Sequence, residues 1–133
     1  MSGYINGKMF FNGISTSSIS LPYGYAGSAF GTAQSGITGA TATVAVTDTL
    51  VLVSSSAAAT ACTVTLPPLA SSVGQNVTIK DLGNNASTHN VTIAASSGEV
   101  IDGGFPSIAI TTDMGSATLV NVGATWINTS DNT

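Results

Sequence analysis

Two carboxylates stand three positions apart in the segment Gly-Glu-Val-Ile-Asp-Gly, at Glu99 and Asp102, and they form the closest acidic pair in the chain. Such a pair can hydrolyse a glycosidic bond when the two carboxyl groups face a sugar from opposite sides. Here both residues flank the end of an expected strand, beside the turn former Gly103-Gly104. The sequence therefore favours a structural role for the pair, and we predict that the chain is not an enzyme.

A second group of oxygen donors, Asp81, Asn84 and Asn85, could bind calcium. The segment Asp-Leu-Gly-Asn-Asn is also an ordinary turn composition, and we favour the turn. His89 is the single histidine, and no Gly-x-Ser-x-Gly nucleophile elbow accompanies the many serines. We interpret His89 as a loop residue; the alternative, an ion bound by the His89 side chains of three copies, requires that the chain is a trimer. No catalytic residue, cofactor or metal is predicted.

Cys62 is the single cysteine, which excludes an intrachain disulfide and a zinc site built from several cysteines. No apolar run approaches the length that crosses a bilayer, so no membrane span is expected. Residues 1–11 include a lysine but no apolar stretch of signal-peptide length, so no secretion signal is expected either.

Charge is scarce in this chain. Two lysines stand against six acidic residues, and charged residues make up 6% of the sequence, where about 25% is usual. The acidic balance excludes a basic surface for nucleic acid. A hydrophobic content of 43% argues against a disordered chain. Because a charged surface normally keeps a monomer dispersed, we expect much of this surface to be covered by copies of the chain or by a larger assembly.

The elements that must position these residues are short strands. Three runs alternate Val, Leu or Ile with Thr and other small or polar residues, at 63–66, 76–80 and 90–94, with turn formers between them. Further strands are predicted at 41–46, 49–53, 106–112, 117–122 and 124–128, residues 99–102 extend a strand, and 54–61 form a loop. The sequence thus predicts an all-β domain over residues 41–133, with short antiparallel strands in a sandwich or prism-like arrangement.

Residues 1–40 differ from the rest, because they are rich in Gly and Ser and dotted with aromatic residues. We predict an extended N-terminal arm that lies on a partner, since exposed aromatic side chains in this number would otherwise favour aggregation. A frayed leader is the alternative. The predicted partner-binding residues are Tyr4, Met9, Phe10, Phe11, Tyr23, Tyr25 and Phe30. Trp126, near the other end of the chain, is expected to anchor a core or an interface.

Several segments together carry a family resemblance over roughly residues 44–127. They are TVTLP at 63–67, VGQNVTIKDLGNNASTHNVTI at 73–93, GEVIDG at 98–103, SIAITTDMGSATLV at 107–120 and GATW at 123–126. In order and spacing the chain resembles a module common in virion proteins of tailed bacteriophages, especially tail-fibre, tailspike and head-surface proteins. The resemblance implies a β-rich homotrimer about a threefold axis, with a structural or attachment role.

From this resemblance we expect a structural protein of the virion, located on the capsid surface or the tail. The most concrete expectation is a trimeric capsid decoration, or cement, protein that binds the major capsid protein and stabilises the coat lattice. The alternative is a tail-fibre or tailspike receptor-binding module, in which exposed loops such as residues 83–90 contact a host surface glycan.

Overall fold

The computed structural model describes residues 4–5, 8–9, 31–54 and 61–130. The chain divides into two compact units, Met1–Phe30 and Gly31–Thr133. In the first unit, strands β1 (Tyr4–Ile5) and β2 (Lys8–Met9) pair antiparallel. All the other described elements belong to the second unit.

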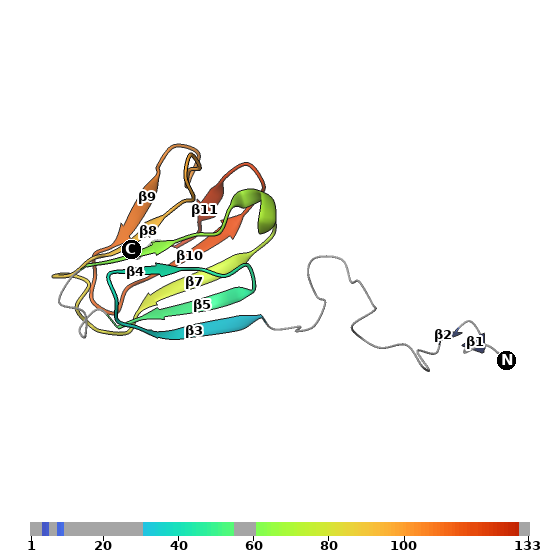
Figure 1. Cartoon of the computed structure of the whole chain (residues 1–133), viewed down its shortest axis with the longest axis horizontal. Helices are drawn as coiled ribbons and strands as arrows, with labels where there is room; N and C mark the ends of the chain where they lie inside the picture. Colours follow the sequence, from blue (N-terminus) through green and yellow to red (C-terminus); the bar gives the residue numbers. More distant parts are fainter. Residues whose placement is uncertain (1–3, 6–7, 10–30, 55–60, 131–133) are drawn as a thin grey trace. The chain divides into compact units, whose positions relative to one another are not determined.

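The second unit winds back and forth between two sheets (Figure 1). Strands β3, β5 and β7 pair in parallel in one sheet, and β4, β6 and β8 pair in parallel in the other. In chain order these strands are β3 (Thr32–Ile37), β4 (Thr41–Thr43), β5 (Asp48–Val53), β6 (Cys62–Thr65), β7 (Asn76–Asp81) and β8 (Val91–Ala94). Consecutive strands alternate between the sheets, so the chain winds around three times and adds one strand to each sheet every time.

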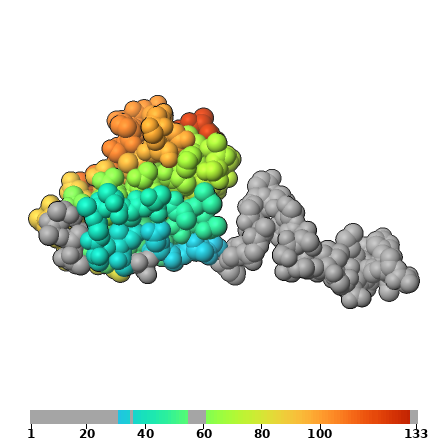
Figure 2. Space-filling view, viewed as in Figure 1, coloured from blue at the N-terminus to red at the C-terminus, as the bar shows by residue number. Residues whose placement is uncertain are grey.

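Antiparallel strands complete both sheets. They are β9 (Ser107–Ile110), which pairs with β8, β10 (Ser116–Asn121), which pairs with β7, and β11 (Trp126–Asn128), which pairs with β10. The sheet orders are β11-β10-β7-β5-β3 and β4-β6-β8-β9. Figure 2 shows the same succession on the surface, from the cyan first turn through green to the orange segment around β9.

The all-β prediction is confirmed, since the only helix among the described residues is the 3-10 turn η3 (Leu69–Ser71). The prediction of antiparallel strands holds in the second unit for the pairs β7–β10, β10–β11 and β8–β9, but the pairs among β3 to β8 are parallel, so both sheets are mixed. Parallel neighbours need a crossover connection, and here each crossover contains a strand of the opposite sheet. Because side chains alternate in the same way along parallel and antiparallel strands, the sequence pattern could not distinguish the two.

The alternation places one set of side chains inside and the other outside. Along β6, Cys62 and Val64 are buried, while Thr63 and Thr65 point outward. Both sheets contribute to one core, and burying each Val, Leu or Ile stabilises the fold by ~1.5–3 kcal/mol. The buried apolar residues are Val44, Val51, Val53, Cys62, Val64, Leu66, Leu69, Val77, Ile79, Ala86, Val91, Ile93, Ile101, Ile110, Ala117, Leu119 and Trp126.

Some strand boundaries differ from the predicted ones. Strand β3 lies within the stretch 1–40 that was expected to be an extended arm; its sequence, Thr-Ala-Gln-Ser-Gly-Ile, contains a single large apolar residue. Strand β4 ends at Thr43, before a turn at residues 46–47. Residues 99–102 contribute only isolated bridges from Ile101 to Phe105 and Trp126. Most of the predicted loop at 54–61 lies outside the described residues.

Candidate functional site

Glu99 and Asp102, the closest acidic pair, hold different parts of the chain. Both carboxylate oxygens of Glu99 accept a hydrogen bond from the Leu69 N–H, at 2.9 and 3.1 Å, at the start of η3. Asp102 Oδ1 accepts from the Asn128 N–H at 2.9 Å, in β11. Asp102 itself has a positive φ of 50°, typical of a tight turn. Each carboxylate therefore anchors a separate main-chain donor.

Asp81 holds the turn that follows β7. Its side chain is fully buried. Oδ1 accepts from the Gly83 N–H at 2.8 Å, and Oδ2 accepts from the N–H groups of Asn85 and Ala86, each at 3.1 Å. Asn84 has the left-handed φ of 56° that a tight turn requires. Among the described residues no group of three His, Cys, Asp or Glu side chains is gathered for a metal ion.

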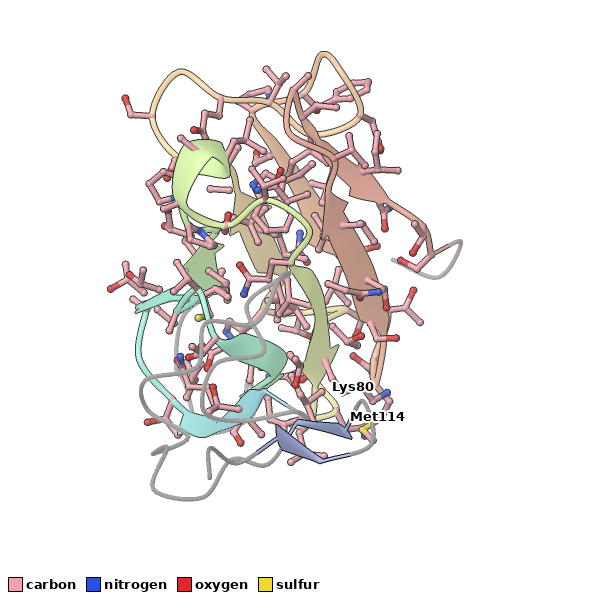
Figure 3. The ribbon with its side chains drawn as sticks, turned by 90° about the vertical axis from the view of Figure 1, so that its right-hand side faces the viewer. Lys80 and Met114 are labelled. Atoms are coloured by element: carbon pink, nitrogen blue, oxygen red, sulfur yellow. The ribbon has the colours of Figure 1, made fainter. Side chains whose placement is uncertain are left out.

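The same carboxylate also holds a second turn, between β9 and β10. Asp81 Oδ2 accepts from the Met114 N–H at 3.2 Å, and Lys80 Nζ donates to the Met114 carbonyl oxygen (Figure 3). Asp113 Oδ1 accepts from the Ser87 N–H at 2.8 Å, which joins the two turns a second time. We call residues 82–90 and 111–115 the Asp81 loop cluster.

His89 belongs to this loop cluster. Its Nδ1 lies 2.7 Å from Asn85 Nδ2, and its N–H donates to the Asn85 carbonyl oxygen at 2.8 Å. The loop cluster also carries two exposed apolar side chains, Leu82 and Met114. Since a hydrogen bond to a charged group contributes about 1.5–3 kcal/mol, the contacts of Asp81 keep this exposed surface in one arrangement.

At the opposite end of the sheets, two amide side chains hold the turns. Gln75 Nε2 donates to the carbonyl oxygens of Ala45 and Asp48, both at 2.8 Å. Asn121 Nδ2 donates to the Leu69 carbonyl oxygen and to Ser72 Oγ, both at 2.9 Å. These bonds tie the turn before β5, the turn before β7 and the end of β10 together.

The buried Asp48 carboxylate reinforces this end. Oδ1 accepts from Thr32 Oγ1 at 2.8 Å, and Oδ2 accepts from Gln34 Nε2 at 2.9 Å and from the Ala45 N–H at 2.8 Å. The carboxylate thus links β3 to the start of β5.

The predicted partner-binding residues fall in the first unit. Tyr4 in β1 and Met9 in β2 are paired positions of the antiparallel pair. The other five, Phe10, Phe11, Tyr23, Tyr25 and Phe30, lie outside the described residues. Trp126 is fully buried, so it is an anchor of the core.

The sequence reasoning missed a set of exposed apolar residues at turns. Val46, Val73 and Val122 are 50%, 67% and 58% exposed, and Phe105 is 59% exposed. The predicted strands 41–46 and 117–122 end at residues 46 and 122, but in the structure both valines lie beyond the ends of β4 and β10. A usable signal exists for two of the four, because Val73 and Val122 each precede a glycine with positive φ, at Gly74 and Gly123.

No family model matches the chain, and no curated protein matches it either. Among the described residues, no helix has the length and apolar character needed to cross a membrane.

Proposed function

We propose that the chain is a structural subunit of a bacteriophage virion, most concretely a homotrimeric capsid decoration protein that binds the major capsid protein and stabilises the coat lattice. In this proposal the two sheets pack as a sandwich, and three copies assemble about a threefold axis. The N-terminal arm, with Tyr4, Met9 and the aromatic residues of the first unit, contacts the coat subunits.

The observation that carries the proposal is the use of the carboxylates. Every acidic residue of the described part of the second unit accepts hydrogen bonds from the chain's own groups; these are Asp48, Asp81, Glu99, Asp102 and Asp113. In hydrolytic sites carboxylates are aimed at a substrate or at an attacking water. Here they hold turns and strand ends, which suits a protein whose role is to be rigid.

The outer surface of the smaller sheet supports the same proposal. Along β4, β6, β8 and β9, the residues that alternate with the core are all Thr, Ser or Ala; these are Thr41, Thr43, Thr63, Thr65, Thr92, Ala94, Ser107 and Ala109. A sheet face without charge or bulky groups can pack against a neighbour without burying an unpaired ion. A subunit that is permanently part of an assembly tolerates such a face, because a neighbour covers it.

Immunoelectron microscopy of the particles of a phage whose genome encodes this chain tests the proposal. We expect antibody raised against the full chain to label the heads, and particles that lack the chain to release their DNA at a lower temperature. Particles in which no part of the head or tail is labelled would contradict a virion role.

A receptor-binding module of a tail fibre or tailspike is the second candidate. It is favoured by the Asp81 loop cluster, whose exposed residues are held in place by main-chain hydrogen bonds to the buried Asp81 carboxylate. A glycan array probed with the full chain separates the two candidates, since selective glycan binding together with tail labelling supports the second. The test variant is Thr88→Ala, which changes an exposed side chain of the loop cluster at a residue without positive φ.

A further inference from the structure

The exposed large apolar residues of the second unit are unevenly placed. Strands β5 and β7 are parallel, so Val46 before β5 and Val73 before β7 lie at the same end. Strands β7 and β10 are antiparallel, so Val122 after β10 also lies there, whereas Leu82 and Met114 lie at the other end. In Figure 1 the turns that carry the three valines are at the right-hand end of the sheets.

Phe105 is at the same end as the valines. Its loop precedes β9, whose first residue, Ser107, pairs with the last residue of β8. Strand β8 is parallel to β6 and β6 to β4, and β4 ends just before the turn that contains Val46. The loop is tied to the turn after β10, because the Gly103 N–H donates to Thr125 Oγ1 at 3.1 Å. We call the surface formed by Val46, Val73, Phe105 and Val122 the Val46 end; it carries four of the six large apolar residues that are exposed in the described part of the chain.

We propose that the Val46 end is where copies of this chain contact one another. The inference deepens the proposed function and rests on the homotrimer within it.

The turns at this end are organised in advance. The Gln75 amide holds the turn that contains Val46, and the Asn121 side chain and main chain hold the turns around Val73 and Val122. Association that must first order a loop loses part of its free energy to conformational entropy. Because these turns are already fixed by hydrogen bonds, little of the gain from covering the valines is lost in that way.

The three valine turns contain no charged residue, which favours a second copy of the chain as the partner. The three turns read Val-Ala-Val-Thr at 44–47, Ser-Val-Gly-Gln at 72–75 and Val-Gly-Ala-Thr at 122–125. The neighbouring carboxylate of Asp48 is buried and bonded to Thr32, Gln34 and Ala45. Asp102, in the loop of Phe105, is exposed, and its carboxylate accepts a hydrogen bond from the Asn128 N–H in β11. The uncharged part of the Val46 end is therefore the three valine turns. At the threefold axis of a homotrimer the same patch of all three copies meets, so like charges there would repel. The uncharged valine turns avoid that repulsion.

Four side chains do not fill a whole interface, because stable interfaces bury about 800 Å² on each partner. They can supply its apolar centre, with the polar Thr, Ser and Gln residues of the same turns as its rim.

Sedimentation velocity on the full chain tests this assignment. The double variant Val73→Asp/Val122→Asp places two carboxylates at the Val46 end. The matched control, Leu82→Asp/Met114→Asp, makes the same change of charge and removes the same number of exposed apolar groups at the other end. We expect the first pair to raise the apparent dissociation constant of the assembly at least tenfold and the control to change it less than twofold, with native near-ultraviolet circular dichroism for both.

Each other outcome of these experiments leads to a different conclusion about the Val46 end. If the wild type assembles and the Val73/Val122 variant assembles equally well, the inference is wrong and the homotrimer stands. If that variant still assembles but no longer binds phage heads, the Val46 end belongs to the coat contact instead. Equal weakening by both pairs would also overturn the inference, while a wild type that stays a single subunit would remove the homotrimer as well. Should the Asp variant unfold, Val73→Ser/Val122→Ser decides in the same way.

Discussion

Asp81 accepts main-chain hydrogen bonds from two turns that are far apart in the sequence, at residues 83–86 and at Met114. A carboxylate can do this because its two oxygens together offer about four acceptor positions. An amide in its place keeps one oxygen as an acceptor and brings two donors toward N–H groups that also need acceptors. At the scale of single residues, the exposed surface of the Asp81 loop cluster therefore depends on one buried charge.

Asp81→Asn should lower the free energy of unfolding by about 2–4 kcal/mol, because N–H groups of two turns lose hydrogen bonds to a buried carboxylate. The matched control is Asp113→Asn, in an exposed residue whose carboxylate accepts a hydrogen bond from the Ser87 N–H; we expect it to lower stability by less than about 1 kcal/mol. Urea unfolding followed by Trp126 fluorescence measures both. Equal losses in the two variants would contradict the central role of Asp81.

Cys62 gives the one residue-scale prediction that depends on pH. Burial raises the pKa of the Cys62 thiol above its ordinary value of 9.0. As the pH rises past 9.0, the unfolded chain loses this proton before the folded chain does, so the free energy of unfolding should fall. Below that pH the contribution is constant.

Two measurements check the thiol. A thiol reagent at pH 8 should modify Cys62 only under denaturing conditions, and the fall in stability above pH 9 should be smaller in Cys62→Ala. Rapid modification of the folded protein would mean that the thiol is accessible.

At the scale of elements, the connection between β9 and β10 depends on Gly115. A Cβ atom built on Gly115 would lie 2.7 Å from Ile110 Cγ2 and 2.7 Å from the Thr112 carbonyl oxygen. Gly115→Ala should therefore destabilise the fold by about 1–3 kcal/mol, because a core side chain and a main-chain oxygen must both move. In the control Gly104→Ala, the added Cβ meets nothing within 4 Å, and stability should change by less than about 0.5 kcal/mol. Thermal unfolding of the two variants provides the comparison.

The strands themselves were the most predictable elements. Around β6, β7 and β8, the alternation of Val or Ile with Thr located each strand to within one residue. Strand β3 escaped prediction because it contains Gly36 and has register shifts against β5, so its apolar pattern is irregular. The sequence pattern could not predict which strands pair, since pairing depends on which strands, distant in the sequence, become neighbours in a sheet.

The candidate site was predictable to a different degree. Glycines and asparagines next to Glu99, Asp102 and Asp81 indicated turns, but the main-chain hydrogen bonds that each of these carboxylates accepts are seen only in the structure. The valines of the Val46 end were not predictable. Exposure of an apolar residue at a strand end depends on what the other sheet covers, which a local pattern does not contain.

At the scale of the whole molecule, the scarcity of charge determines which force can hold copies together. With two lysines against six acidic residues per chain, ion pairs can contribute little to an interface between identical subunits, whereas apolar turns and uncharged sheet faces can contribute in every copy.

Salt screens charge interactions over about 10 Å at 0.1 M and about 3 Å at 1 M, but it does not weaken apolar contacts. The proposed assembly of the full chain should therefore persist, or tighten slightly, between 0.05 and about 1 M NaCl. Sedimentation velocity over this range measures the effect, with the Val73→Asp/Val122→Asp variant as the comparison: its introduced carboxylates repel one another, so salt should restore part of its association. Dissociation of the wild type at high salt would show instead that its few charges hold the copies together.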